Sequence, residues 1–137
     1  MTMKFLVYIE TDNGDAVASS WEALGAALGL SDDVEAVVIG DKISVAVEET
    51  VQRGAKKVYV VEDETHALFD LERHLADVCN VLTLSGANAF FASHSANGRD
   101  LAAALGTKKG AGVIADALEL AVDGDKLKGV RGIYSGN

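Results

Sequence analysis

Short apolar runs that alternate with helical patterns limit what this sequence can fold into more than any other feature. The runs at residues 4–9, 34–39, 58–61 and 88–92 are rich in β-branched and aromatic residues, which is typical of strands buried on both faces. A brief fifth run at 112–114 is predicted to be another strand. Strands that alternate with helices imply right-handed crossovers and a mostly parallel sheet covered by helices on both faces.

The stretches between the runs predict four helices. Ser19 and Glu22 have the spacing of a capping box, which predicts a helix start there, and a second helix is expected at 43–54. The third helix has the clearest apolar stripe and is ended by Gly86, and the fourth opens at residues 97–100. The residues expected on the buried faces of these two helices are Leu71, Leu75, Val78 and Leu82 in the third, and Leu101 and Leu105 in the fourth.

The end of the chain predicts a hairpin rather than another helix. Asp123-Gly124 separates two extended runs, 118–122 and 126–134, and Asp-Gly in that position is a strong hairpin signal. Residues 11–15 are polar and predict a loop. There is no repeat or linker in between, so residues 1–137 are predicted to form one α/β domain, a three-layer sandwich whose parallel sheet gains an antiparallel hairpin at its C-terminal edge.

Charge and composition exclude several classes of protein. The chain has 137 residues, a formal net charge of −9 and 49% hydrophobic residues, which argues against both disorder and nucleic-acid binding. A single cysteine rules out a disulfide framework and a thiolate zinc site within one chain. No apolar run approaches the ~20 residues that span a bilayer, and the first residues do not resemble a signal peptide, so a cytoplasmic location is expected.

A ligand is expected at the carboxyl ends of the parallel strands, where the strand order reverses. The loops there are 10–16, 40–41, 62–65 and 93–97, and most of them are acidic, which disfavours a phosphate. The acidic run 62–64 is most simply a solvated strand end. The exception is the helix start at Asn97, Gly98 and Arg99, where free amides beside an arginine could hold an anion. The commoner arrangement is that Asn97 or Ser95 only caps the helix and that Arg99 pairs with a local carboxylate.

Catalytic and metal sites find little support in the residue pattern. Ser93-His94-Ser95 places hydroxyls beside an imidazole, but neighbours on an extended chain point apart. His66, His74 and His94 include no pair with the i, i+4 spacing of a helical metal site. His74 is expected to be packed or solvated near the buried stripe, and Cys79 to be a small apolar filler. No catalytic residue and no metal ligand is predicted.

Five segments, in order, resemble the amino-terminal domain of the electron-transfer flavoprotein alpha subunit: KFLVYIE at 4–10, GAKKVYVVED at 54–63, NGRDLAAAL at 97–105, GVIADALEL at 112–120 and VRGIYSGN at 130–137. The Gly-Arg-Asp helix start and the Tyr-x-Gly-Asn ending are the most specific parts. This resemblance implies an adenine nucleotide alpha hydrolase-like fold. It also implies that the chain is a scaffolding domain that packs against a beta subunit and is not an enzyme with its own substrate.

The resemblance further implies a heterodimeric electron carrier. In the family, FAD takes electrons from dehydrogenases, including the acyl-CoA dehydrogenases of fatty acid oxidation, and passes them to a membrane quinone oxidoreductase. The FAD-binding domain of the family follows the region matched here, so no flavin-contacting residue is transferred to this sequence and no FAD is expected on this chain alone. Without its partner, the domain is expected to be able to self-associate through the uncovered surface.

Two other functions are weighed against this one. The first is a stand-alone nucleotide-binding domain resembling universal stress proteins, but Gly98, Gly106 and Gly110 do not reproduce the spacing of their phosphate loop. The second is an enzyme that uses His94 with Ser93 or Ser95, for which nothing in the sequence fixes a base beside a nucleophile.

Overall fold

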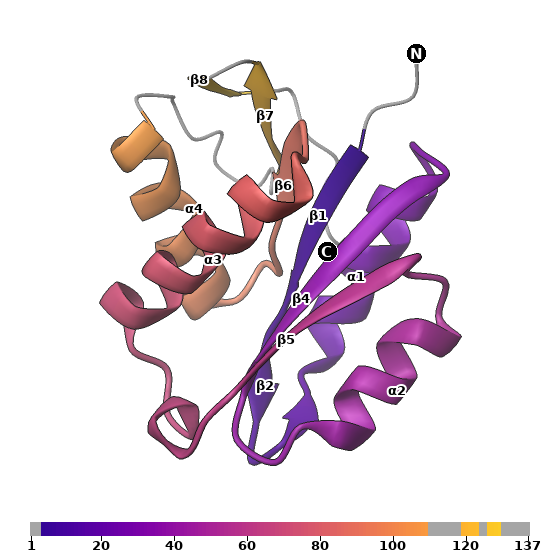
Figure 1. Ribbon diagram of the computed structural model, residues 1–137, viewed down its shortest axis with the longest axis vertical. Helices are drawn as coiled ribbons and strands as arrows, with labels where there is room; N and C mark the ends of the chain where they lie inside the picture. Colours follow the sequence, from indigo (N-terminus) through magenta and orange to yellow (C-terminus); the bar gives the residue numbers. More distant parts are fainter. Residues whose placement is uncertain (1–3, 110–118, 124–125, 130–137) are drawn as a thin grey trace.

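Strands and helices alternate along the chain and build three layers (Figure 1). The structure is a computed structural model, and it describes residues 4–109, 119–123 and 126–129. The strands are β1 (Lys4–Ile9), β2 (Thr11–Asp12), β3 (Asp15–Ala16), β4 (Asp33–Gly40), β5 (Lys57–Glu62), β6 (Ala89–Phe91), β7 (Glu119–Asp123) and β8 (Lys126–Gly129). The helices are α1 (Ala18–Leu28), α2 (Ser44–Gln52), α3 (Leu71–Ser85) and α4 (Ala96–Lys109), with a short 3₁₀ helix, η1 (Glu64–His66).

The main sheet has the strand order β5-β4-β1-β6-β7-β8. β1 pairs in parallel with β4 on one edge and with β6 on the other, and β4 pairs in parallel with β5. β7 and β8 are antiparallel to their neighbours, so the expected mostly parallel sheet and terminal hairpin are both confirmed. The chain builds outward from β1 to β5 and then crosses to β6, and the strand order therefore reverses between β1 and β6.

Both faces of β1 are buried, and alternate side chains contribute to two separate cores. Phe5, Val7 and Ile9 face α1 and α2, whereas Leu6 and Tyr8 face α3 and α4. None of these five side chains is more than 5% exposed. This alternation is the period-two pattern of a strand with a helical layer on each side, and Figure 1 shows the helices on opposite faces of the sheet.

The helices pack as the apolar pattern predicts, with one exception. Leu101 and Leu105 of α4 are fully buried, and Gly86 ends α3 with a left-handed φ of 69°. Leu71 is 37% exposed because it is the first residue of α3, and His74 occupies the buried face one turn later. Cys79 is partly buried against the core on this side, as expected for a filler. Within the described residues, no helix is long and apolar enough to cross a membrane.

Two local predictions are wrong, and one cannot be compared. The capping box does not form: α1 begins at Ala18, so Ser19 lies inside the helix, and no side chain caps its start. Residues 11–15 are not a plain loop, because β2 and β3 form a small antiparallel pair around Asn13 and Gly14. These two residues have φ of 52° and 86°, the left-handed backbone that a tight Asn-Gly hairpin requires. The strand expected at 112–114 lies outside the described residues.

Two leucines in α3 test the packing of the core. Leu82 is 7% exposed and Leu84 is 74% exposed, although both are leucines of the same helix. Replacing Leu82 by Ala should lower the free energy of unfolding by about 2–5 kcal/mol, because it leaves a cavity under the helix. Leu84→Ala should change it by less than about 0.5 kcal/mol. Urea unfolding of both variants measures the difference, and equal losses would contradict the layer arrangement.

Candidate functional site

The carboxyl ends of β1 and β6 meet where the strand order reverses, which is the usual place for a ligand in a doubly wound sheet. Glu10 directly follows β1, and residues 93–95 follow β6 and lead into α4. We call the place between the two strand ends, where sheets of this kind commonly have a ligand crevice, the switch-point crevice. It is the first place to look for a binding site.

The side chain of Glu10 lies in the switch-point crevice and is bonded to residues on its far side. It is only 8% exposed. One carboxylate oxygen, Oε1, accepts hydrogen bonds from Ser93 Oγ at 3.1 Å and from Ser95 Oγ, and Oε2 accepts one from Asn97 Nδ2 at 3.1 Å. The backbone N–H of Glu10 donates to Ser20 Oγ at 2.9 Å. A buried carboxylate is costly unless it is hydrogen-bonded, and here it accepts from three donors, two in the β6–α4 connection and one in the first turn of α4.

The start of α4 uses its own residues as caps. Ser95 Oγ accepts the backbone N–H of Gly98 at 3.0 Å, the geometry of an N-cap. A side chain at Gly98 would overlap the carbonyl oxygen of Ser93 and come within 2.8 Å of its hydroxyl. Of the anion-binding candidates, Asn97 therefore bonds to Glu10 and Gly98 to Ser95, while Arg99 lies exposed. Both serine hydroxyls of the enzyme hypothesis are bound to Glu10.

Other acidic residues near this edge also bind backbone amides of the chain. Glu62 Oε2 accepts the N–H of Ile43 at 2.9 Å and so holds the start of α2. Asp63 caps η1 by accepting the N–H of Thr65 at 2.8 Å, and this bond holds the pKa of the Asp63 carboxyl below its usual range. The acidic run 62–64 is thus more than a solvated strand end. It supplies caps that sequence patterns did not predict.

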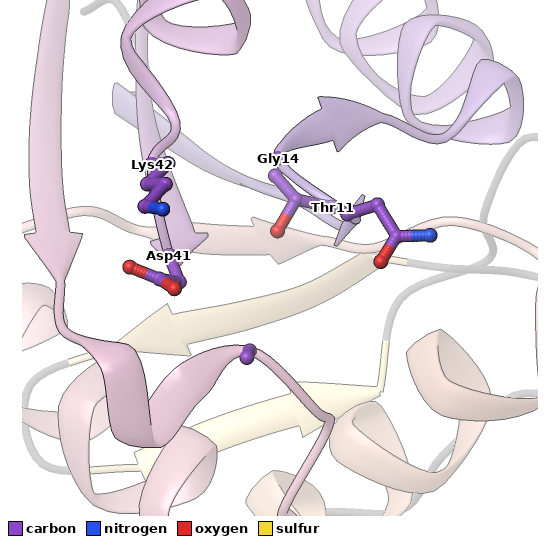
Figure 2. A pocket seen from close by; sticks show the side chains of 6 residues that line it. Thr11, Gly14, Asp41 and Lys42 are labelled. Carbon is purple, nitrogen blue, oxygen red and sulfur yellow. The ribbon is translucent and has the colours of Figure 1, made fainter.

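A separate, small hollow lies beside the tip of the β2–β3 hairpin (Figure 2). Its volume is about 210 Å³, below the 300–1,000 Å³ of typical ligand pockets. Figure 2 shows Asp41 and Lys42 on one side of it and Gly14 on the other. With one carboxylate and one ammonium among them, the lining residues carry no net charge that would select an anion. The lining residues are Thr11, Asn13, Gly14, Asp41, Lys42 and Ala67.

His66 of η1 and His74 of α3 are separate in the sequence, but their rings are in contact. His66 Nε2 lies 2.9 Å from Asp77 Oδ2, and the rings of His66 and His74 are 5.0 Å apart. His74 Nδ1 lies 3.0 Å from the carbonyl oxygen of Asp70, and its ring packs against Phe69 at 4.7 Å. Spacing alone did not predict this cluster, because it depends on how η1 folds back onto α3. Within the described part of the chain, no group of three His, Cys, Asp or Glu residues could hold a metal ion.

The histidine cluster predicts a loss of stability in mild acid. Burial, and then the neighbouring His66, hold the pKa of His74 below its usual 6.5, partly opposed by Asp70 and Asp77. As the pH falls through 6.5, His74 becomes protonated in the unfolded chain but stays neutral in the folded chain. The free energy of unfolding should therefore fall, by at most about 1.4 kcal/mol per pH unit for this proton. His74→Phe should have a shallower slope in urea titrations from pH 7.5 to 5, and an unchanged slope would contradict this account.

A pair of glycine variants tests the close approach at the start of α4. Gly98→Ala should destabilise the chain by about 1–3 kcal/mol, because the new methyl group meets the Ser93 backbone. Gly25→Ala is the control: this helical glycine has nothing within 4 Å of the added carbon, so its free energy of unfolding should rise by up to about 1 kcal/mol. Thermal unfolding of both variants gives the comparison. If Gly98→Ala has the same stability as wild type, the approach of Gly98 to the Ser93 backbone is less close than described.

Similarity to known proteins agrees with this architecture. A family model described as the electron transfer flavoprotein domain matches residues 5–137. The chain is 32% identical over 130 residues to the electron transfer flavoprotein subunit alpha of Syntrophomonas wolfei, covering 95% of this chain and 41% of that protein. It is 28% identical to the corresponding subunit of Bacillus subtilis, covering 99% and 42%, and 30% identical to protein FixB of Azotobacter vinelandii, covering 85% and 34%. The chain thus spans about two fifths of the length of the first two of these relatives, and it belongs to the electron transfer flavoprotein domain family.

Proposed function

We propose that this chain is the amino-terminal scaffolding domain of an alpha-type subunit of an electron transfer flavoprotein. The family match over residues 5–137 supports this proposal, as do relatives named as alpha subunits over most of the chain. The structural observation that carries it is the switch-point crevice, which is filled by Glu10 and its donors instead of being open to a nucleotide. The role of the domain is then to support other parts of the complex.

The cofactor and the partners follow from that role. The full-length subunit would carry FAD on residues outside this chain and pair with a beta-type subunit. The complex would accept electrons from dehydrogenases, such as acyl-CoA dehydrogenases, and deliver them to a quinone oxidoreductase. The domain itself would have no substrate of its own and would work in the cytoplasm. A nucleotide-binding domain of the universal stress type has less support, because the hollow beside the hairpin is small and has no net positive charge.

A flavin titration tests where the cofactor is held. FAD fluorescence should show no saturable quenching when the 137-residue chain is added, since the proposal assigns the flavin-binding residues to a region beyond it. An established flavin-binding protein serves as the positive control, and AMP and ATP are titrated in parallel by calorimetry. Saturable quenching at a one-to-one ratio would overturn the proposal, because these residues would then form a flavin site of their own.

Light scattering tests the scaffolding role. Mixed with the beta-type subunit of the same organism, the chain should form a one-to-one complex. Alone at high concentration, the chain should have a measured mass above its monomer mass of 14.3 kDa. Exposed apolar side chains that would contact the beta-type subunit should then contact a second copy of the chain. Leu68 and Leu84, which are 82% and 74% exposed, are examples of such side chains. A chain that stays monomeric and also forms no complex with the beta-type subunit would contradict this role.

A further inference from the structure

We propose that Glu10 is a built-in ligand of the switch-point crevice. Its carboxylate takes the position that an external anion occupies in sheets of this topology, and it thereby closes the crevice to phosphates and nucleotides. Glu10 thus determines what this edge of the domain can bind. The proposal concerns the isolated chain and does not depend on flavin or on a beta-type partner.

Glu10 directly follows β1 and lies beside the start of α4. Its carboxylate bridges from the end of β1 to residues 83–87 positions later in the chain, across the point where the strand order reverses. The donors are two hydroxyls and one amide from the residues that open α4. The start of a helix is a typical environment for a bound anion, because the helix dipole and unpaired N–H groups favour negative charge there. Here a side chain of the same protein supplies that anion.

The donors to Glu10 differ in chemistry from those of the other buried glutamate of the described residues. Glu35, another buried glutamate, is 6% exposed and lies 3.6 Å from the ammonium of Lys4, with the hydroxyl of Tyr59 at 3.1 Å. Buried carboxylates usually take such a cation as partner. Among the described residues, none brings a cation to Glu10 within ion-pair distance. Its donors are neutral, as in a pocket that receives an anion from outside.

Removing the built-in ligand should therefore leave a small site for an external carboxylate. In Glu10→Ala, the hydroxyls of Ser93 and Ser95 and the amide of Asn97 lose their acceptor, and the Tm should fall by about 5–15 °C. Acetate has the carboxylate that was removed and is small enough for the vacated space. At a concentration tenfold above its dissociation constant it should raise the Tm of Glu10→Ala by at least about 4 °C, whereas sodium chloride at equal ionic strength should not.

Three controls make the rescue specific. Wild type should not respond to acetate, because Glu10 already occupies the crevice. Ile9→Val is destabilised at the neighbouring, fully buried apolar position and should also show no response. Glu10→Ala combined with Ser95→Ala lacks one of the donors and should lose most of the rescue. If Glu10→Ala gains no more from acetate than Ile9→Val does, or if wild type shows saturable binding of phosphate or AMP at Arg99, the proposal is overturned.

A second variant keeps the test decisive if Glu10→Ala does not fold. Glu10→Gln keeps the volume but replaces one acceptor oxygen by an NH2 donor, which then faces either the amide of Asn97 or the hydroxyls of Ser93 and Ser95. Its Tm should fall by several degrees, and acetate should not restore it because the space remains filled. A Glu10→Gln chain as stable as wild type would show that the carboxylate has no ligand role, and it would overturn the proposal without any reference to the alanine variant.

Discussion

The constraint on which the domain depends is the burial of β1 from Phe5 to Ile9. It is paired on both edges and covered on both faces, so the chain emerges from it at Ile9 with no exposure to solvent. The next residue is a glutamate that remains 8% exposed. A charge left there without partners would cost several kcal/mol. The connection from β6 to α4 therefore has to approach closely enough to donate, and Gly98 permits that approach.

Other carboxylates along the carboxyl edge of the sheet also accept hydrogen bonds from the chain. Glu62 holds the start of α2, and Asp63 and Asp70 cap η1 and α3. Each carboxylate lies at the amino end of a helix, where negative charge is stabilised by unpaired N–H groups. These carboxylates are part of the net charge of −9, and each of them contributes a hydrogen bond to the fold. Part of the acidic character of this edge is therefore structural, because these carboxylates hold the starts of the helices that follow the strands.

The sequence predicted the elements well and the contacts between distant residues poorly. Runs such as 4–9 and the stripe of α3 carry their own periodicity, so strands, helices and layers followed from local pattern. The capping box at Ser19 failed because the N-cap of α1 is Val17, two residues earlier, and Ser20 is bonded to the backbone of Glu10. The contacts of Glu10 join residues 83–87 positions apart, and the ring contact of His66 depends on a turn. Periodicity contains no information about either.

In the switch-point crevice Ser95 caps α4, which is the commoner of the two arrangements weighed for this helix start. Asn97, Gly98 and Arg99 have the features of an anion-binding helix start, and what the pattern omitted was an anion already within the chain. In a fold whose strand ends converge, a carboxylate following the first strand competes with any external ligand for the same donors. Its covalent attachment gives it a high effective concentration, so a weakly binding phosphate is at a disadvantage. The distinction between a scaffolding domain and a nucleotide-binding domain of this topology can then depend on the single residue that follows β1.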